Sequence, residues 1–147
     1  MTKSRSKKTI IPFHLIPLDE DGAHLIIDAT INDIGIKLLI DTGASKTVFD
    51  RKRMRVLMSG KRFRKNHALS VGLGTSKMKS HYAVLEKFSI GELMLENFQT
   101  VLLDLSIVNK SYTALGLSPI DGVLGGDILN HYGAEINYKK KYLLLFR

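Results

Sequence analysis

A chain of 147 residues is the size of one domain and can bury a hydrophobic core without help from disulfides or metals. Cysteine is absent, which excludes disulfides, thiolate nucleophiles and cysteine-bound metals, and the five histidines do not have the spacing of metal ligands. We therefore expect no metal site and no cofactor.

The formal net charge of +8 is concentrated in residues 1–8 and 51–65. Basic clusters bind nucleic acids or anionic membranes by releasing counterions. Aromatic residues for base stacking are nearly absent from them, with only Phe63 in the second. We favour a basic flexible tail over 1–8 and a solvated basic face. Nucleic-acid binding stays an alternative.

Membrane insertion is not expected, because no apolar run approaches the roughly 20 residues that cross a bilayer. The apolar stretch over residues 10–18 follows basic residues as in a signal peptide, but it contains His14 and two prolines and no small-residue cleavage site follows. We expect a cytoplasmic protein.

The N-terminal part of the domain, which we place at 9–147, is predicted to consist of strands. Residues 9–18 favour an edge strand that contains prolines and ends at the turn-forming residues 19–22. Residues 24–31 alternate imperfectly, and 36–40 are apolar and buried on both faces. The short turn between them contains glycine and predicts a hairpin.

The central part mixes strands with a helix. Residues 47–49 predict a short strand, after which Asp50 is suited to cap a basic helix that reaches about Met58. Residues 68–71 lead into a glycine-rich hairpin tip at 72–76, and 83–90 form the returning strand.

The C-terminal part begins with a strand over 93–105, and residues 106–117 fit either a short helix or a loop. An apolar strand at 123–125 enters a short helix at 127–132, which Gly133 ends. Two strands, 134–138 and 142–147, are predicted to close the fold as a hairpin.

The Asp41-Thr42-Gly43 turn is the first candidate site, because the apolar strand 36–40 delivers its carboxylate onto a tight turn. Gly43 permits a bend that a side chain would obstruct, and the Thr42 hydroxyl can lock it. The tripeptide alone is an ordinary turn sequence.

Two further features are equally ordinary alone. Val123-Leu124-Gly125 reads as a buried strand that ends at a helix, and Gly72-Leu73-Gly74 reads as a β-turn. In the order Asp-Thr-Gly, glycine-bearing hairpin, apolar-apolar-Gly and short helix, the features together resemble the retropepsins. These are the retroviral-type aspartic proteases and their single-domain cellular and bacterial relatives. The resemblance covers roughly residues 23–147.

This resemblance implies a mostly β fold, a closed acid-protease β-barrel forming a single lobe with one or two short helices and a flap hairpin. It implies that Asp41 is the catalytic carboxylate and that the hydroxyl of Thr42 bonds across to the partner's active-site loop. The supporting residues of that loop are Thr42, Gly43, Ala44 and Ser45. The implied flap, which contacts substrate, contains Val71, Gly72, Leu73, Gly74 and Thr75. The segment implied to pack beneath the loop is Val123, Leu124 and Gly125.

The chain departs from the retroviral pattern at two paired positions. Retroviral enzymes usually have a carboxylate and an arginine where this chain has Ser45 and Gly126. Loss of both partners leaves no orphan charge, so the fold is not put in doubt. The interval from Asp41 to Gly125 is also longer, and we expect an enlarged loop or helix around 50–65 and 106–118 to absorb it.

One Asp-Thr-Gly per chain implies a homodimer. The chemistry needs two carboxylates that share a proton, and a two-fold axis supplies the second copy of Asp41. The apolar residues 142–146 fit a strand that interleaves with the partner's end or one in the chain's own core.

The preferred function is an aspartic endopeptidase that cleaves extended peptide or protein substrates. A second hypothesis is a non-catalytic, protease-like module that dimerises or binds peptides. The intact Asp41, Thr42 and Gly43 speak against it.

Overall fold

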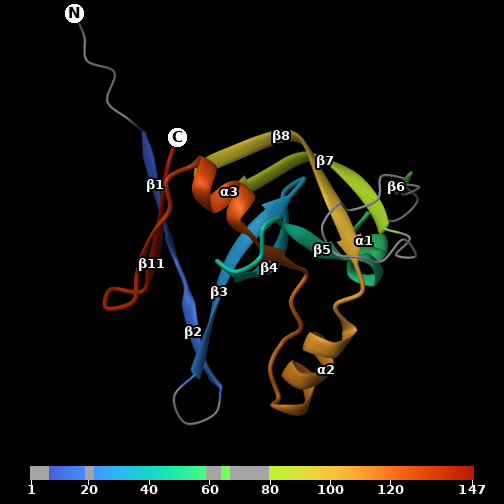
Figure 1. Cartoon of the computed structure of the whole chain (residues 1–147), viewed down its shortest axis with the longest axis horizontal. Helices are drawn as coiled ribbons and strands as arrows, with labels where there is room; N and C mark the ends of the chain where they lie inside the picture. Colours follow the sequence, from blue (N-terminus) through green and yellow to red (C-terminus); the bar gives the residue numbers. More distant parts are fainter. Residues whose placement is uncertain (1–6, 19–21, 59–63, 67–79) are drawn as a thin grey trace, which may run out of the picture.

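The computed structural model describes residues 7–18, 22–58, 64–66 and 80–147. Strands dominate this part of the chain, with three short helices at its surface (Figure 1). The strands are β1 (Lys8–Pro12), β2 (His14–Leu18), β3 (Gly22–Ile31), β4 (Ile34–Ile40), β5 (Val48–Asp50), β6 (Arg64–Asn66), β7 (Ser80–Ile90), β8 (Leu93–Leu103), β9 (Gly122–Leu124), β10 (Glu135–Asn137) and β11 (Tyr142–Phe146). The helices are α1 (Arg51–Leu57), α2 (Ser106–Ala114) and α3 (Gly126–His131).

Six of the described strands form a closed barrel. The larger sheet has the order β2-β3-β4-β9-β5-β8-β7-β6, and a further pairing of β3 with β7 joins its two sides. That closing pairing matches Thr30 with Ser89 and Ile31 with Phe88. The predicted mostly β, closed acid-protease barrel is thus confirmed.

The β3–β4 hairpin confirms the prediction from the alternating and apolar segments. Ile31 pairs with Ile34, and the two residues between them, Asn32 and Asp33, have φ angles of 49° and 67°. Positive φ at both central positions is the geometry that matches the twist of a two-residue hairpin. Leu38 then pairs with Gly122 of β9, in parallel register.

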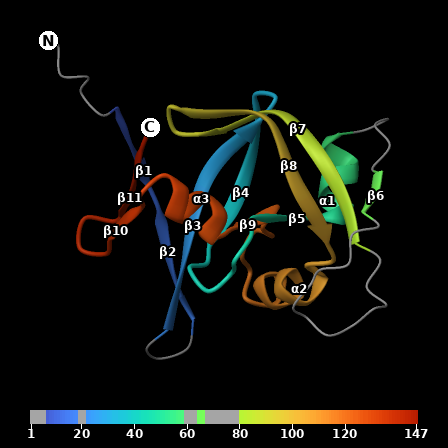
Figure 2. The same ribbon diagram turned by 45° about the horizontal axis from the view of Figure 1, so that its top comes forward.

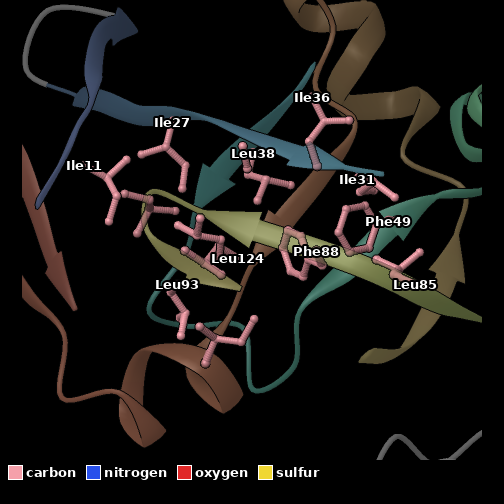
Figure 3. Close-up of a cluster of buried hydrophobic side chains, with 14 of the residues drawn as sticks. Ile11, Ile27, Ile31, Ile36, Leu38, Phe49, Leu85, Phe88, Leu93 and Leu124 are labelled. Atoms are coloured by element: carbon pink, nitrogen blue, oxygen red, sulfur yellow. The ribbon is translucent and has the colours of Figure 1, made fainter. Parts of the chain in front are cut away.

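The main core lies inside the barrel, and its side chains come from nearly every strand (Figure 3). Phe49 and Phe88 are fully buried and pack edge to face, with ring centroids 5.4 Å apart. Leu38 and Leu124 are also fully buried. Burying each such side chain contributes about 1.5–3 kcal/mol to folding. The strands before and after the Asp41 loop are therefore held in place by the core.

The segment 9–18 is two strands rather than the single strand expected. The strand is interrupted at Phe13. The ring of Phe13 is buried, and its N–H donates to the Lys141 carbonyl at 3.1 Å. Before the break β1 pairs with β11, and after it β2 pairs with β3. A buried aromatic residue at the crossing point therefore divides the segment between two sheets.

The chain ends form a separate three-stranded sheet of order β1-β11-β10. Leu143 and Leu145 of β11 are fully buried. Of the two alternatives for residues 142–146, the strand in the chain's own core is the one found. β1 begins at Lys8, the last residue of the expected tail, and residues 1–6 lie outside the described part.

The helices follow the local signals. Asp50 caps α1 as predicted, its side chain accepting from the Arg53 N–H. Residues 106–117, which fitted either a helix or a loop, contain α2. The described part therefore has three helices, where one or two were expected. Among the described residues no helix is long and apolar enough to cross a membrane.

Candidate active site

Asp41 lies directly after β4. Its N–H donates to the Leu124 carbonyl of β9 at 3.0 Å, continuing the β4–β9 pairing by one residue. The side chain beyond this anchor is exposed. A rigid, buried strand pair thus presents one carboxylate to the solvent.

The turn after Asp41 folds back onto that carboxylate. The Gly43 N–H donates to Asp41 Oδ1 at 2.9 Å, and the Ala44 N–H donates to the Asp41 carbonyl at 3.2 Å. A β-carbon at Gly43 would lie 3.3 Å from Asp41 Oδ1. The turn therefore holds one carboxylate oxygen, and a side chain at position 43 would crowd that oxygen.

The strand β9 and helix α3 support the loop from below. The Gly126 N–H donates to the Ala44 carbonyl at 2.7 Å, and the Asp127 N–H donates to the Ser45 carbonyl at 3.0 Å. At Gly125 a β-carbon would lie 2.5 Å and 2.6 Å from the carbonyl carbon and oxygen of Lys46. Only glycine permits this close approach of the two backbones.

Asp127 ties the end of the loop to α3. Its Oδ1 accepts from the Thr47 N–H at 2.9 Å and from the Thr47 hydroxyl at 2.7 Å. The Thr47 hydroxyl accepts from the Gly125 N–H at 3.0 Å. Sequence reasoning placed Asp127 only at the start of a helix, because its partner lies 80 residues away along the chain.

Ser45 and Gly126 occupy the two positions at which retroviral enzymes pair a carboxylate with an arginine. Ser45 and Gly126 are joined to the opposing segments through backbone hydrogen bonds only. The Asp127–Thr47 contact supplies a side-chain link between the same loop and helix. The loop and α3 therefore stay connected although this chain lacks the charged pair.

Another carboxylate, Asp121, connects the elements on either side of the Asp41 loop. It is 5% exposed and accepts from Arg53 Nε at 2.5 Å and from the Lys37 N–H at 2.8 Å. Its own carbonyl accepts from the Asp50 N–H at 2.8 Å. Asp121 therefore joins β4, β5 and α1, and Arg53 neutralises its buried charge.

The structure brings together most of the residues that the sequence singled out. The loop Asp41 to Ser45 lies against Leu124 and Gly125, and Thr42 is exposed at its tip. The proposed flap, Val71 to Thr75, lies outside the described residues. In the part that is described, no three His, Asp or Glu side chains are grouped closely enough to hold a metal ion.

Comparison with known proteins points to one family. The sequence model of the aspartyl proteases matches residues 27–128, which include the loop, β9 and the start of α3. No curated protein matches the chain.

Two solved structures are similar to the fold. A retropepsin-like aspartic protease from Rickettsia conorii has 21% identity and a TM-score of 0.60, covering 99% of this chain and 97% of that one. The retroviral protease-like domain of Ddi1 from Leishmania major has 15% identity and a TM-score of 0.54, covering 84% of this chain and 94% of that one. At these identities the likeness concerns the fold.

Proposed function

Because the chain belongs to the aspartyl protease family, we propose that it is an aspartic endopeptidase whose dyad contains two copies of Asp41, one from each subunit of a homodimer. The observation that carries this proposal is the exposed Asp41 carboxylate at the end of β4, framed by its own turn and by β9. The family supports the reaction class, and the geometry supports Asp41 as the catalytic residue.

The proposed chemistry uses a shared proton. Two carboxylates about 3 Å apart cannot both ionise, so one is a base while the other stays protonated. The anionic Asp41 takes a proton from a water molecule that attacks the scissile carbonyl. The protonated Asp41 polarises the carbonyl oxygen. The Gly43 N–H, which donates to Asp41 Oδ1, keeps the carboxylate oriented toward the water.

A second chain is needed because the other aspartates nearby have structural contacts. Asp50 caps α1, Asp121 pairs with Arg53, and Asp127 holds Thr47. Asp104 accepts from the Ser106 N–H. A two-fold axis beside Asp41 brings the second carboxylate without a second motif in the chain.

The surface beside Asp41 suits contact with a second copy. Thr42 is exposed, and within the described part of the chain its hydroxyl makes no hydrogen bond. It borders a depression of about 320 Å³, whose lining also includes Leu129, Ala134 and Ile136. We propose that the two Thr42 hydroxyls bond across the axis and that this partly apolar depression is covered in the dimer.

The proposed substrate is an extended peptide or protein segment. Such a segment binds through backbone hydrogen bonds, and side-chain pockets set the preference for sequence. Val71 to Thr75 are proposed to close over the peptide as a flap and exclude water.

Replacement of Asp41 tests the catalytic assignment. Asp41→Asn keeps an oxygen that can accept from the Gly43 N–H but removes the base, so cleavage of a peptide library should fall at least about a thousandfold. Equal unfolding midpoints of variant and wild type would serve as the control. Persistent cleavage by the variant would remove Asp41 from the mechanism.

The oligomeric state tests the shared dyad. Sedimentation of the wild type with a pepstatin-like statine inhibitor should show a dimer. A chain that binds the inhibitor and stays monomeric would contradict the dyad of two Asp41 residues.

A further inference from the structure

A second apolar cluster lies outside the barrel core, on the side of the Asp41 loop. Its buried members come from β3, α2, β9 and the segment before β9: Ile26, Tyr112, Ile120 and Val123. Half-buried residues pack around it: Ile16, Leu39, Ala44, Val48, Leu105, Val108 and Leu117. The cluster therefore joins α2 to the loop that carries Asp41.

The alternation of β4 places this cluster on the same face as the catalytic carboxylate. Leu38 and Ile40 are 0% and 8% exposed and point into the barrel core. Leu39 points to the opposite face, and Asp41, two residues further, shares the side of Leu39. A substrate side chain that enters next to Asp41 on this face meets the second cluster.

The helix α2 is fixed on that face through its N-terminal half and the residue before it. Asn109 makes two hydrogen bonds with Ile120, its Nδ2 donating to the carbonyl at 3.1 Å and its Oδ1 accepting from the N–H at 2.8 Å. Before the helix, the Leu105 N–H donates to Asp50 Oδ1 at 2.8 Å. Figure 2 shows α2 at the lower edge of the barrel, below β5 in this view. These hydrogen bonds hold the helix in a fixed position against the cluster.

Tyr112 is the buried residue of this helix. Its side chain is 2% exposed, and its hydroxyl oxygen lies 2.5 Å from Nδ1 of His24 on β3. Burial raises the pKa of Tyr112, so the hydroxyl keeps its proton and can donate to that nitrogen. His24 thus fixes the ring across the face between β3 and α2.

The cluster residues that flank Asp41 along the chain are apolar and partly exposed. Leu39, Ala44 and Val48 pack against the cluster but are only half-buried. They form a floor on which an apolar side chain of modest size can rest. A large aromatic side chain would need the volume that the Tyr112 ring fills.

We propose that the ring of Tyr112 determines specificity by closing the side-chain pocket next to Asp41, so that the pocket accepts small or aliphatic residues. This inference rests on the proposed endopeptidase function and adds the class of residue beside the cleaved bond. Tyr112 acts through shape and does not take part in the chemistry.

The test compares matched peptides that carry valine or phenylalanine beside the cleaved bond. In Tyr112→Ala the ratio of kcat/KM for phenylalanine over valine should rise about tenfold or more, since a difference in pocket size of this order gives 10–200-fold discrimination. Tyr112→Phe keeps the ring and should leave the ratio within about twofold. Ile107→Ala, on the same helix but 82% exposed in wild type, is the matched control.

Tyr112→Leu supplies a smaller side chain with less risk to folding, and it should shift the ratio in the same direction. An unchanged ratio in a folded Tyr112→Ala or Tyr112→Leu protein would overturn the proposal while leaving the endopeptidase function intact.

A binding measurement separates the two proposals. Statine peptides with valine or phenylalanine at the same place can be titrated calorimetrically into Asp41→Asn and into Asp41→Asn/Tyr112→Leu. A gain confined to the phenylalanine peptide supports the pocket whether or not the wild type cleaves, and equal affinities in both proteins contradict it. Absence of cleavage by the wild type would contradict only the proposed function.

Discussion

Gly125 and Gly126 stand side by side at the entry to α3 and have different surroundings. A β-carbon at Gly125 would lie 2.5 Å from the Lys46 backbone, whereas one at Gly126 would have its nearest neighbour at 3.4 Å. Backbone atoms of a packed loop cannot move aside as the end of a flexible side chain can. Replacing Gly125 should therefore lower the free energy of unfolding more than replacing Gly126.

Gly125→Ala should lower the free energy of unfolding by about 1–3 kcal/mol or more, the range for forcing an extra carbon into a packed site. Gly126→Ala should stay within about 1 kcal/mol of wild type, because the methyl group fits and the unfolded chain loses entropy. Urea unfolding of both proteins measures the difference. Equal midpoints would show that the Lys46 backbone can yield.

Tyr112 predicts a specific loss of stability at alkaline pH. Burial raises the pKa of its phenol above the ordinary value of 10.0, so the folded state holds this proton more tightly than the unfolded state. The resulting stability is fully present below the unfolded pKa and is lost as the pH rises through the folded pKa.

The unfolding midpoint of the wild type should therefore fall more steeply above about pH 10 than that of Tyr112→Phe. Tyr138→Phe is the matched control, because Tyr138 is 59% exposed. Parallel profiles for wild type and Tyr112→Phe would contradict the assignment.

At the level of elements, the junction between α3 and the β4–β5 loop decides where Asp41 stands. Two backbone hydrogen bonds and the Asp127–Thr47 pair connect them. The Asp127–Thr47 bonds cross a separation of 80 residues in sequence, and both residues lie within the matched family region. Movement of α3 should therefore move the Asp41 turn.

Asp127→Ala leaves the Thr47 N–H without its acceptor, which should cost about 1–3 kcal/mol of stability and reduce kcat more than it raises KM. Asp127→Asn keeps an acceptor oxygen and should retain most of both. Urea unfolding and steady-state kinetics measure the two quantities. Wild-type kcat in a destabilised Asp127→Ala protein would show that the junction serves folding alone.

At the level of the whole molecule, the proposed shared dyad would make activity depend on pairs of chains. Asp41→Asn subunits mixed with wild type should form heterodimers that have one carboxylate and do not cleave. An equimolar mixture, refolded together, should retain about one quarter of the activity of wild type at the same total concentration. Activity that falls only to one half would indicate that each chain works alone.

Much of the fold followed from local chemistry. The apolar run before Asp41, the two-residue turn at Asn32 and Asp33, and the cap at Asp50 each carry their signal within a few residues. The candidate site was partly predictable for the same reason, since Asp41 to Ser45 are contiguous. The split of residues 9–18 at Phe13 was not predictable, because it depends on which of two sheets each half meets.

The sequence by itself determined the strand-rich character of the chain, the single Asp-Thr-Gly turn and the family to which its motifs are similar. Only the tertiary structure decided that Asp127 holds Thr47, that residues 142–146 pack within their own chain, and that α2 places Tyr112 on the face of Asp41. The physical reason is the range of the interactions. Turns, caps and alternation act between near neighbours, whereas these contacts join residues that only the closed barrel brings together.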